Sequence, residues 1–470
     1  MISHEPPTGH QNRIDDYFWK IADLTGQDLF IRQFCLQVVP DNPASEGNPC
    51  NGVWLAYVKL VPLNAHEVEG LKQERQEKKH KRLFAHHDAW SYTYSYRPTT
   101  AGEIQRELEP FWNTDFARLY WEGGMGDRMY YPTRLGIYAT DDWIRDPYRV
   151  GDRLASESWQ AFKKNGIDPF RTALEYTHRI GMEFHGTYRP AGFHFPVPEE
   201  RWDEGGLYDR HPEWRGQDRS GRPTPRLSYA YPEVRKAAIA LLKEMAAYPV
   251  DGICIAYNRR PPLLEYEAPI IESFKARYGK SPKEVSDDDP QWLAHRATVL
   301  TQFMREVREA MEEVARQRKT VAIPQVSVIV MSSEAENLYY GIDLRVWIKE
   351  QLVDTIIPYT SVRRLTSAAD SWTNPNDARF FLDITKGSAC KLALNMMPRQ
   401  QSPEEYRRRA YALYEIGVDY LFFWDSDQRN DFSPSWNALR RLGHKEELQS
   451  WMRVGSPQLE RPGSALKKLV

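Results

Sequence analysis

The sequence predicts an α/β fold, a (β/α)8 TIM barrel with a small β-rich N-terminal extension, and three observations support this prediction. From residue 82 onward, eight short apolar runs alternate with segments of helical periodicity. The runs are almost continuously apolar, which is typical of parallel strands that are buried on both faces. No G-x-G-x-x-G pattern follows the first run. A closed barrel is therefore favoured over a doubly wound open sheet.

The expected strands and helices follow one another in regular alternation. The expected strands are Leu83–His87, Phe116–Trp121, Met182–Gly186, Gly252–Tyr257, Val321–Val330, Thr355–Tyr359, Lys391–Met396 and Tyr420–Trp424. The expected helices are Thr100–Trp112, Phe170–Ile180, Pro232–Ala247, Ala268–Tyr278, Gln291–Arg318 and Ser402–Ile416. Glu103 stands three residues after Thr100 and predicts a capping box. Ser402 followed by Pro403 is typical of a helix start.

The beginning of the chain is expected to be β-rich and to end in a charged linker. Phe30–Val39 and Val53–Leu63 have the β-branched and aromatic composition of strands, and Ala65–Lys81 is charged and helical in pattern. We therefore divide the chain into a β-rich segment with its linker (residues 1–80), a catalytic barrel (81–445) and a C-terminal tail (446–470).

Composition excludes several classes of protein. The 470 residues carry a net charge of −2, so the basic surface of a nucleic-acid-binding protein is not expected. No apolar run reaches the ~20 residues that span a membrane. The start MISHEPPTGHQNR lacks the features of a signal peptide. We expect a cytoplasmic protein if residue 1 is the native start, and an exported one, in which Cys35 and Cys50 could pair, if the true start is missing. The sequence does not indicate an oligomeric state.

Polar and aromatic residues gather where the expected strands end, and barrel enzymes carry their working residues at that end. Aromatic residues make up 13% of the chain, with 15 Trp and 26 Tyr. Three times an aromatic residue precedes an acid there, in the pairs ending in Glu122, Glu267 and Asp425. The candidate ligand-binding residues at these ends are Asp88, Trp90, Trp121, His185, Tyr188, Arg189, Asn258, Arg259, Tyr359, Trp424 and Asp427.

This combination of residues suits a carbohydrate. The apolar face of a pyranose stacks on an indole, and its hydroxyls bind carboxylates, amides and guanidinium groups. Glycosidic cleavage requires two carboxyl groups, one of them protonated, and an adjacent aromatic ring helps to raise the pKa of the acid. Arg189 and Arg259 indicate an anionic sugar, because guanidinium groups bind carboxylate or sulfate well. A carbohydrate is the expected partner, and no organic cofactor is expected.

Each candidate also has a structural interpretation. Glu122 could orient the glycine-rich turn that follows it, and Glu267 could be a first-turn acid that interacts with the dipole of the next helix. Asp425 could form an Asx turn. Asp88 could hold a loop, and His185 could be a histidine of the core.

A metal-dependent hydrolase and a non-catalytic sugar-binding barrel are the alternative functions. His86, His87, Asp88 and His185 could hold a divalent cation. Adjacent His86 and His87 point to opposite sides of a strand, however, and no His-x-His or His-Glu-x-x-His spacing occurs, so we expect no metal. The sequence contains neither a G-x-S-x-G nor a Walker pattern. A barrel that binds sugars without catalysis stays open, because a fold does not determine a function.

Three segments carry a resemblance to a known family. HPEWRGQDRSGRPTPRLSYAYPEVR (211–235), with its HPEW loop and PEVR helix start before the fourth strand, resembles glycosyl hydrolase-like family ten. LYWEGGMGDRMYYPT (119–133) and EYEAPIIESFKARYG (265–279) are similar to segments of related bacterial barrels. The resemblance covers roughly residues 82–430. It implies a carbohydrate-active barrel that acts on a polysaccharide or a peptidoglycan strand.

The resemblance also bears on the catalytic pair. It does not settle the pair, but a large related clan of barrels commonly places an acid after the fourth strand and a nucleophile after the seventh. Here the seventh strand ends in Asn395 and Arg399, without a carboxylate. We therefore expect Glu267 to be the general acid and Asp425 the nucleophile or base, with Glu122 as the reserve candidate.

Overall fold

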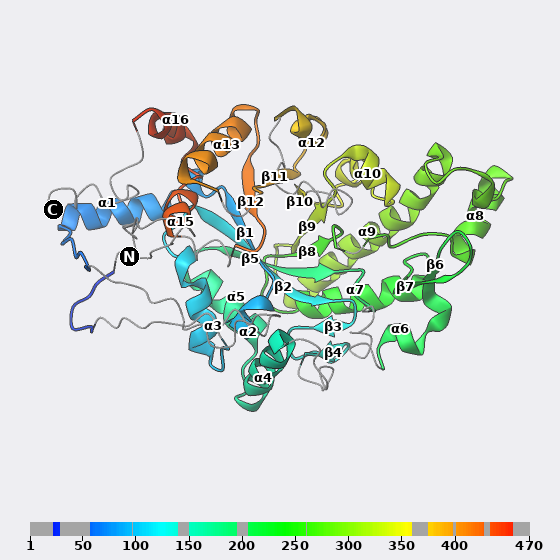
Figure 1. Ribbon diagram of the computed structural model, residues 1–470, viewed down its shortest axis with the longest axis horizontal. Coiled ribbons are helices and arrows are strands. Elements are labelled where there is room, and N and C mark those ends of the chain that lie inside the picture. The colour runs from blue at the N-terminus through cyan, green and yellow to red at the C-terminus, as the bar shows by residue number, and fades with distance from the viewer. Residues whose placement is uncertain are drawn as a thin grey trace, which may run out of the picture.

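The eight expected strands form a closed barrel at the centre of the molecule (Figure 1). The computed structural model describes residues 22–28, 57–95, 97–139, 150–194, 205–259, 261–359, 375–397, 401–426 and 433–454. The barrel strands are β1 (Leu83–His87), β2 (Phe116–Met125), β5 (Glu183–Arg189), β8 (Gly252–Ala256), β9 (Gln325–Val330), β10 (Thr355–Pro358), β11 (Lys391–Asn395) and β12 (Tyr420–Phe423). Each strand pairs in parallel with the next, and β12 pairs with β1. The predicted (β/α)8 barrel is therefore confirmed.

Helices cover the outside of the barrel. Those that connect the strands include α3 (Ala101–Leu108), α5 (Pro169–Arg179), α7 (Pro232–Ala246), α9 (Pro290–Arg318), α10 (Glu334–Tyr339), α11 (Leu344–Lys349), α12 (Arg379–Thr385) and α13 (Pro403–Glu415). Thr100 and Glu103 form the predicted capping box at the start of α3. The Ser402 hydroxyl accepts a hydrogen bond from the backbone N–H of Glu405 in α13. These starts were predictable because a cap is a local signal in the sequence.

Smaller elements lie around the barrel. β3 (Arg128–Met129) and β4 (Ile137–Tyr138) extend the sheet beside β2, whereas β6 (Arg215–Gln217) and β7 (Pro223–Leu227) form a separate two-stranded sheet. The other helices are α1 (Ala65–Gln76), α2 (Ser91–Ser95), α4 (Val150–Lys164), α6 (Leu207–Arg210), α8 (Ala268–Tyr278), α15 (Ser433–Leu439) and α16 (Lys445–Val454). In Figure 1, α6, α8 and β6 lie toward the right edge of the view, well apart from β1 and β12.

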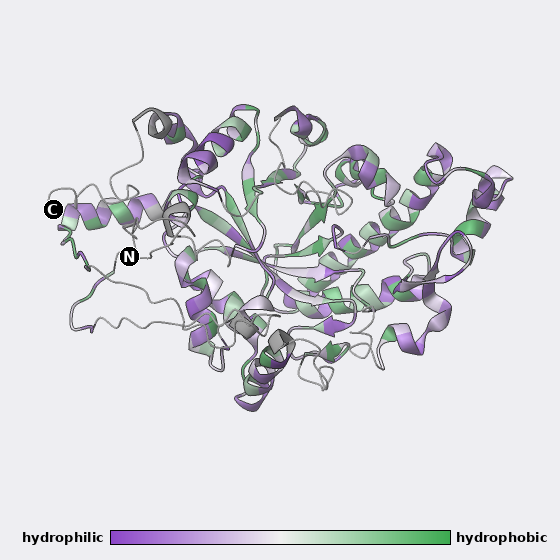
Figure 2. Ribbon diagram, in the orientation of Figure 1, coloured by the Kyte–Doolittle hydropathy of each residue, from purple (hydrophilic) through white to green (hydrophobic). Residues whose placement is uncertain are grey.

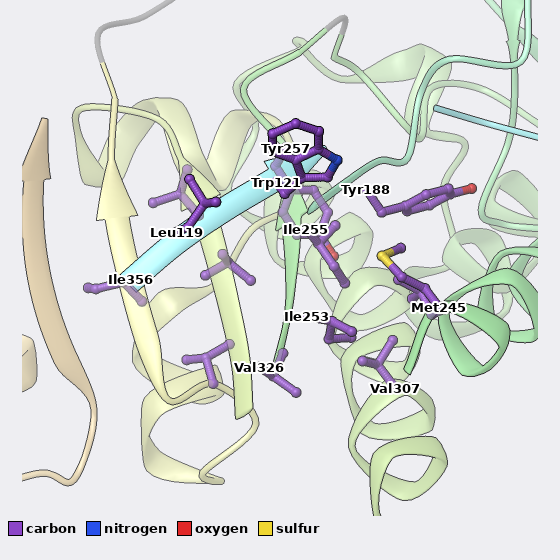
Figure 3. Close-up of a cluster of buried hydrophobic side chains, with 14 of the residues drawn as sticks. Leu119, Trp121, Tyr188, Met245, Ile253, Ile255, Tyr257, Val307, Val326 and Ile356 are labelled. Carbon is purple, nitrogen blue, oxygen red and sulfur yellow. The ribbon is translucent and has the colours of Figure 1, made fainter. Parts of the chain in front are cut away.

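Side chains along each strand alternate between two hydrophobic layers. The interior of the barrel is lined by Phe84, Tyr120, Cys254, Ala256, Ile329, Ile357, Ala393, Phe422 and Trp424. A larger layer lies between the strands and the helices, and Figure 3 shows Leu119, Trp121 and Tyr188 of that layer together with Met245 of α7. The barrel strands are rich in hydrophobic residues, whereas the helices carry many hydrophilic ones (Figure 2). The alternation decides which residues face the barrel mouth, defined here as the carboxyl ends of the eight strands.

The expected β-rich extension lies mostly outside the described residues. Phe30–Val39 is among the residues that are not described, as are Cys35 and Cys50. The described part of the second expected strand, residues 57–63, forms neither helix nor strand, so the structure does not confirm a strand there. The charged helix α1 is confirmed, although it ends at Gln76. No helix in the described part of the chain is long and apolar enough to cross a membrane.

Candidate active site

Strand geometry brings His86 and Glu122 to the inside of the barrel mouth. His86 belongs to β1 and Glu122 to β2. Each lies two residues beyond an interior residue of its own strand, Phe84 in β1 and Tyr120 in β2. Both side chains point inward, because residues two apart on a strand share a face. Both are fully buried.

A chain of four ionisable side chains crosses the mouth. Nη2 of Arg189, from β5, lies 2.5 Å from Oε2 of Glu122. The same Glu122 oxygen lies 3.9 Å from Nε2 of His86. On the other side of the imidazole ring, Nδ1 of His86 lies 3.4 Å from Oδ1 of Asp425, which follows β12. Two carboxyl groups therefore flank one imidazole ring.

The backbone holds His86 and Asp425 in place relative to each other. The backbone N–H of Ser426 donates to the His86 carbonyl oxygen at 2.8 Å, and the Ser426 hydroxyl accepts from the His86 N–H at 3.0 Å. Asp425 has a φ of +45°, a left-handed conformation that Asp tolerates better than most residues. The ring of Trp424 stacks on His86 with the centroids 3.9 Å apart. The imidazole is thus held by groups other than the carboxylates.

Burial changes the titration of these groups. It raises the pKa of Glu122 to about 8, against the opposing effect of Arg189. It lowers the pKa of His86, although Asp425 acts in the other direction. At neutral pH Glu122 is therefore largely protonated and His86 is neutral. A buried carboxylic acid of this kind can donate its proton to a leaving oxygen.

Two asparagines add polar atoms to the same mouth. Asn258 lies two residues beyond Ala256, and Asn395 two residues beyond Ala393, both of which face the interior. Both asparagines are buried, and neither amide has a hydrogen-bond partner among the described residues. Buried polar groups are nearly always hydrogen-bonded in native proteins, so unpaired ones require an explanation.

Arg259 and Tyr359 lie around Trp424. The guanidinium carbon of Arg259 lies over the Trp424 ring, 5.6 Å from its centroid, and the ring of Tyr359 is 5.0 Å away. Trp424 is buried and stacks on His86, so it supports its neighbours and offers little surface to a sugar. Arg259 is exposed, and the charge of Arg189 lowers its pKa, which shows that the two guanidinium groups are close.

Asp88 and Trp90 follow β1. Asp88 accepts hydrogen bonds from the backbone N–H groups of Trp90 and Ser91 at 3.0 and 2.8 Å, so it holds the start of α2. Trp90 is half-buried and stacks on Tyr130, with the ring centroids 5.5 Å apart. Tyr130 contributes to the electrostatic environment of Arg189. Tyr130 thus lies between the Trp90 indole and Arg189 of the mouth.

Three predicted substrate contacts lie elsewhere. Trp121 stacks on His87 at 4.4 Å, and the Tyr188 hydroxyl donates to a backbone oxygen at 2.9 Å; both rings lie between the strands and the helices (Figure 3). His185 faces the interior, but it lies deeper in the barrel, where its Nδ1 is 3.2 Å from the Ser327 hydroxyl. The structure does not bring these three side chains to the mouth: Trp121 and Tyr188 lie on the outer face of their strands, and His185 lies below the strand ends.

Glu267 does not join the mouth. It is the buried N-cap residue of α8, and its carboxylate accepts backbone N–H bonds from Glu265 at 3.0 and 3.1 Å and from Gln217 at 3.3 Å. Burial raises its pKa to about 7. Figure 1 shows α8 far from β1, which carries His86, and from β12, which Asp425 follows. The long connection after β8 takes Glu267 away from the strand end, so the structure does not bring Glu267 and Asp425 together.

His86 is the central residue that the sequence analysis did not assign to sugar chemistry. In the sequence, His86 stands out only as a possible metal ligand, and Asn395 only because it is not a carboxylate. Counting in twos along the expected strands, from Phe84 to His86 and from Ala393 to Asn395, would have placed both inside the barrel. Asp427 lies outside the described residues.

The described residues contain one cluster with the spacing of metal ligands, and it lies outside the barrel mouth. It consists of His80, His444 and Glu447. The two imidazole rings are stacked, 3.9 Å apart and 10° from parallel. Their lone pairs lie in nearly parallel planes and cannot converge on one ion, and His444 Nδ1 already lies 2.7 Å from Asp115. This geometry does not fit a metal site.

The fold and these groups define a (β/α)8 barrel with two buried carboxyl groups at the carboxyl ends of its strands. Within that class, residues 147–378 match the family model described as glycosyl hydrolase-like 10. The resemblance expected from the sequence is confirmed over this range. The matched range holds β5, β8, β9 and β10, and thus Arg189 and Asn258 of the mouth.

Three solved enzyme structures are similar at low identity. The catalytic domain of β-amylase from Paenibacillus polymyxa is 11% identical with a TM-score of 0.46, over 80% of this chain and 99% of that chain. A β-galactosidase from Rahnella sp. R3 is 12% identical with a TM-score of 0.47, over 80% and 57%. The GH20 exo-β-N-acetylglucosaminidase from Vibrio harveyi is 10% identical with a TM-score of 0.43, over 80% and 57%. Likenesses this distant say nothing about the activity of this chain, and comparison with curated proteins finds no match.

Proposed function

We propose that the chain is a glycoside hydrolase that cleaves O-glycosidic bonds in an oligosaccharide or polysaccharide. Glu122 is the general acid, and Asp425 is the base or nucleophile. The observation that carries the proposal is the position of these two carboxyl groups on either side of His86 at the barrel mouth. Glycosidases require one protonated and one ionised carboxyl group, and the raised pKa of Glu122 fits the first role.

The polar groups around this pair suit a sugar. The unpaired amides of Asn258 and Asn395 can each donate to and accept from hydroxyl groups, and such pairing would offset the cost of burying them. Trp90, which follows β1 and stacks on Tyr130, is half-buried and offers an indole for stacking. Acid–base catalysis by carboxyl groups requires no organic cofactor.

Arg259 indicates an acidic sugar unit. Its guanidinium group is exposed beside Trp424, whereas Arg189 is already paired with Glu122. An exposed guanidinium group at a sugar-binding mouth can bind a carboxylate or sulfate in a bidentate manner. The proposed substrate is therefore a glycan that carries uronic acid, lactyl or sulfate groups.

The test is hydrolysis of a glycan panel, neutral and acidic, by Glu122→Gln and Asp425→Asn, with Glu267→Gln as the matched control. We expect each of the first two variants to lose about 10²–10⁴-fold in kcat while the circular dichroism spectrum stays that of the wild type. Glu267→Gln should keep its activity, because that carboxylate accepts hydrogen bonds from Glu265, Gln217 and Ser228 and lies away from the mouth. Full activity in both Glu122→Gln and Asp425→Asn rules out the proposed pair.

A non-catalytic carbohydrate-binding barrel is the second candidate. The observation that favours it is the 2.5 Å contact between Arg189 and Glu122, which occupies the proposed acid. Calorimetric titration with the same panel separates the two functions. Binding of a glycan that the wild type never hydrolyses would favour the second candidate.

A further inference from the structure

His86 contacts both proposed catalytic carboxyl groups at once. Its two ring nitrogens lie 3.4 Å from Asp425 and 3.9 Å from Glu122. The ring is fully buried, is stacked on Trp424, and belongs to a backbone segment that Ser426 binds from β12. It cannot swing toward either carboxyl group without breaking these contacts. The position of His86 is therefore set before any substrate arrives.

The groups that face the ring are ionisable. Besides Asp425 and Glu122 they include Arg189 and Asp88, both of which act on its charge or on that of Glu122. Neither nitrogen of His86 makes a hydrogen bond of normal geometry with the described residues. Contacts of 3.4 and 3.9 Å are longer than hydrogen bonds, but catalytic hydrogen bonds are often long in free enzymes and shorten when substrate binds.

The chemistry of a neutral imidazole fixes what these contacts can be. One nitrogen carries a proton and the other a lone pair. With the proton on Nδ1, His86 donates to the Asp425 carboxylate, the nearer partner, and Nε2 accepts the proton of the Glu122 carboxylic acid. The other tautomer would set the Nδ1 lone pair against the negative charge of Asp425, which is unfavourable in a buried site.

We propose that His86 is a positioning residue that holds the two carboxyl groups in opposite protonation states, by donating from Nδ1 to ionised Asp425 and accepting at Nε2 from protonated Glu122. The kinetic consequence of this inference rests on the proposed glycosidase function, but the tautomer and the protonation states do not. The proposal assigns to His86 a specific role in the acid–base pair that no motif in the sequence indicates.

Two substitutions of His86 each remove one of the two contacts of the ring and keep the other. In His86→Asn the amide nitrogen lies near the Nδ1 position, so the donor to Asp425 stays and the acceptor for Glu122 is lost. In His86→Gln the amide lies near the Nε2 position, so the acceptor for Glu122 stays and the donor to Asp425 is lost. We expect both variants to lose roughly a hundredfold in kcat, with little change in KM, because the carboxyl groups are misplaced.

The pH profile of kcat separates positioning from a merely structural role. His86→Asn should move the alkaline limb, set by Glu122, down by about one pH unit, because the acid loses its acceptor. His86→Gln should move the acidic limb, set by Asp425, up by about one unit, because the carboxylate loses its donor. His87→Asn is the matched control: His87 faces Trp121 and Glu107 on the other side of β1, so this variant should lose stability without moving either limb. The proposal is overturned if neither limb moves in the His86 variants. It is also overturned if His86→Asn moves the acidic limb and His86→Gln moves the alkaline limb.

Nitrogen-15 NMR of the histidine side chains tests the same proposal without activity. His86, assigned with the His86→Gln variant, should show a protonated Nδ1 and a bare Nε2 at pH 7. Carbon-13 titration of the Glu122 carboxyl should give a lower pKa in His86→Asn than in the wild type. If no glycan is hydrolysed but these resonances behave as expected, the proposed function fails and the role of His86 stands. A protonated Nε2 or an imidazolium at pH 7 overturns the role of His86.

Discussion

The two ends of the barrel interior differ in how their buried polar groups are hydrogen-bonded. At the amino ends of the strands, Arg118 of β2 donates to Glu183 at 2.8 Å, to Tyr120 at 3.0 Å, to Thr355 at 3.1 Å and to Gln325 at 2.8 Å. One guanidinium group thus joins four strands, and all of its nitrogens are used. This end of the barrel is built for stability.

At the mouth, the amides of Asn258 and Asn395 are buried and lack hydrogen-bond partners in the part of the chain that the structure describes. Each such group lowers the stability of the fold by about 1–3 kcal/mol. The guanidinium group at one end of the barrel is therefore fully paired, whereas two buried amides at the other end are unpaired. The difference indicates that the mouth is arranged for a ligand at the expense of stability.

The largest effect is expected from the acid at the mouth. The folded pKa of Glu122 is raised to about 8, whereas an ordinary Glu titrates near about 4.3. The carboxyl group thus favours folding fully below about pH 4.3, and this contribution is lost as the pH rises through about 8. The free energy of unfolding of the wild type, relative to Glu122→Gln, should fall by up to about 1.4 kcal/mol per pH unit across that window.

Urea unfolding of both proteins from pH 4 to pH 9 measures this difference. Glu267→Gln serves as the comparison, since the pKa of Glu267 is raised only to about 7. The difference in unfolding free energy between the wild type and Glu267→Gln should therefore stop changing at a lower pH. A difference between wild type and Glu122→Gln that does not vary with pH would mean that Glu122 is an ordinary, ionised carboxylate paired with Arg189.

A smaller effect, and of a different kind, is expected at the amino end. Arg118→Met removes the donor for four acceptors, of which Tyr120 and Thr355 are fully buried. We expect a loss of about 2–4 kcal/mol in the free energy of unfolding, with normal kcat in the folded protein. Arg118→Lys keeps the positive charge but lacks the planar set of donors of a guanidinium group. Its free energy of unfolding should therefore lie between those of the wild type and Arg118→Met. A loss of kcat at constant KM in either variant would contradict the division of the barrel into two ends.

The sequence predicts the barrel far better than it predicts the mouth, and the reason is physical. Strands such as Gly252–Ala256 are continuous apolar runs and helices such as α13 start with local caps, so both leave a signal within a few neighbouring residues. The site depends on which face of a strand a residue occupies and on where long connections lead.

Trp121 and Glu122 illustrate the first difficulty. They are adjacent in sequence, yet one packs under the helices and the other faces the mouth. Glu267 illustrates the second, because nothing in its neighbourhood predicts that the connection after β8 carries it to α8 and away from Asp425. Asp425 does lie at a strand end, and the structure places it across His86 from Glu122, the reserve candidate of the sequence.

The smallest expected effect is a gain in stability at the mouth, and it compares the two ends of the barrel interior most directly. Asn258→Leu and Asn395→Leu replace unpaired buried amides by apolar groups of similar volume, so each should raise the free energy of unfolding by about 1–2 kcal/mol. Ser327→Ala is the matched change at the paired end, where the hydroxyl lies 3.2 Å from both Tyr120 and His185, and it should lower stability by a similar amount. Both asparagine variants should also bind glycans more weakly, measured by calorimetry, because a hydroxyl would lose its partner. If the asparagine variants are destabilised as Ser327→Ala is, the amides are paired in the free protein and the contrast between the two ends is false.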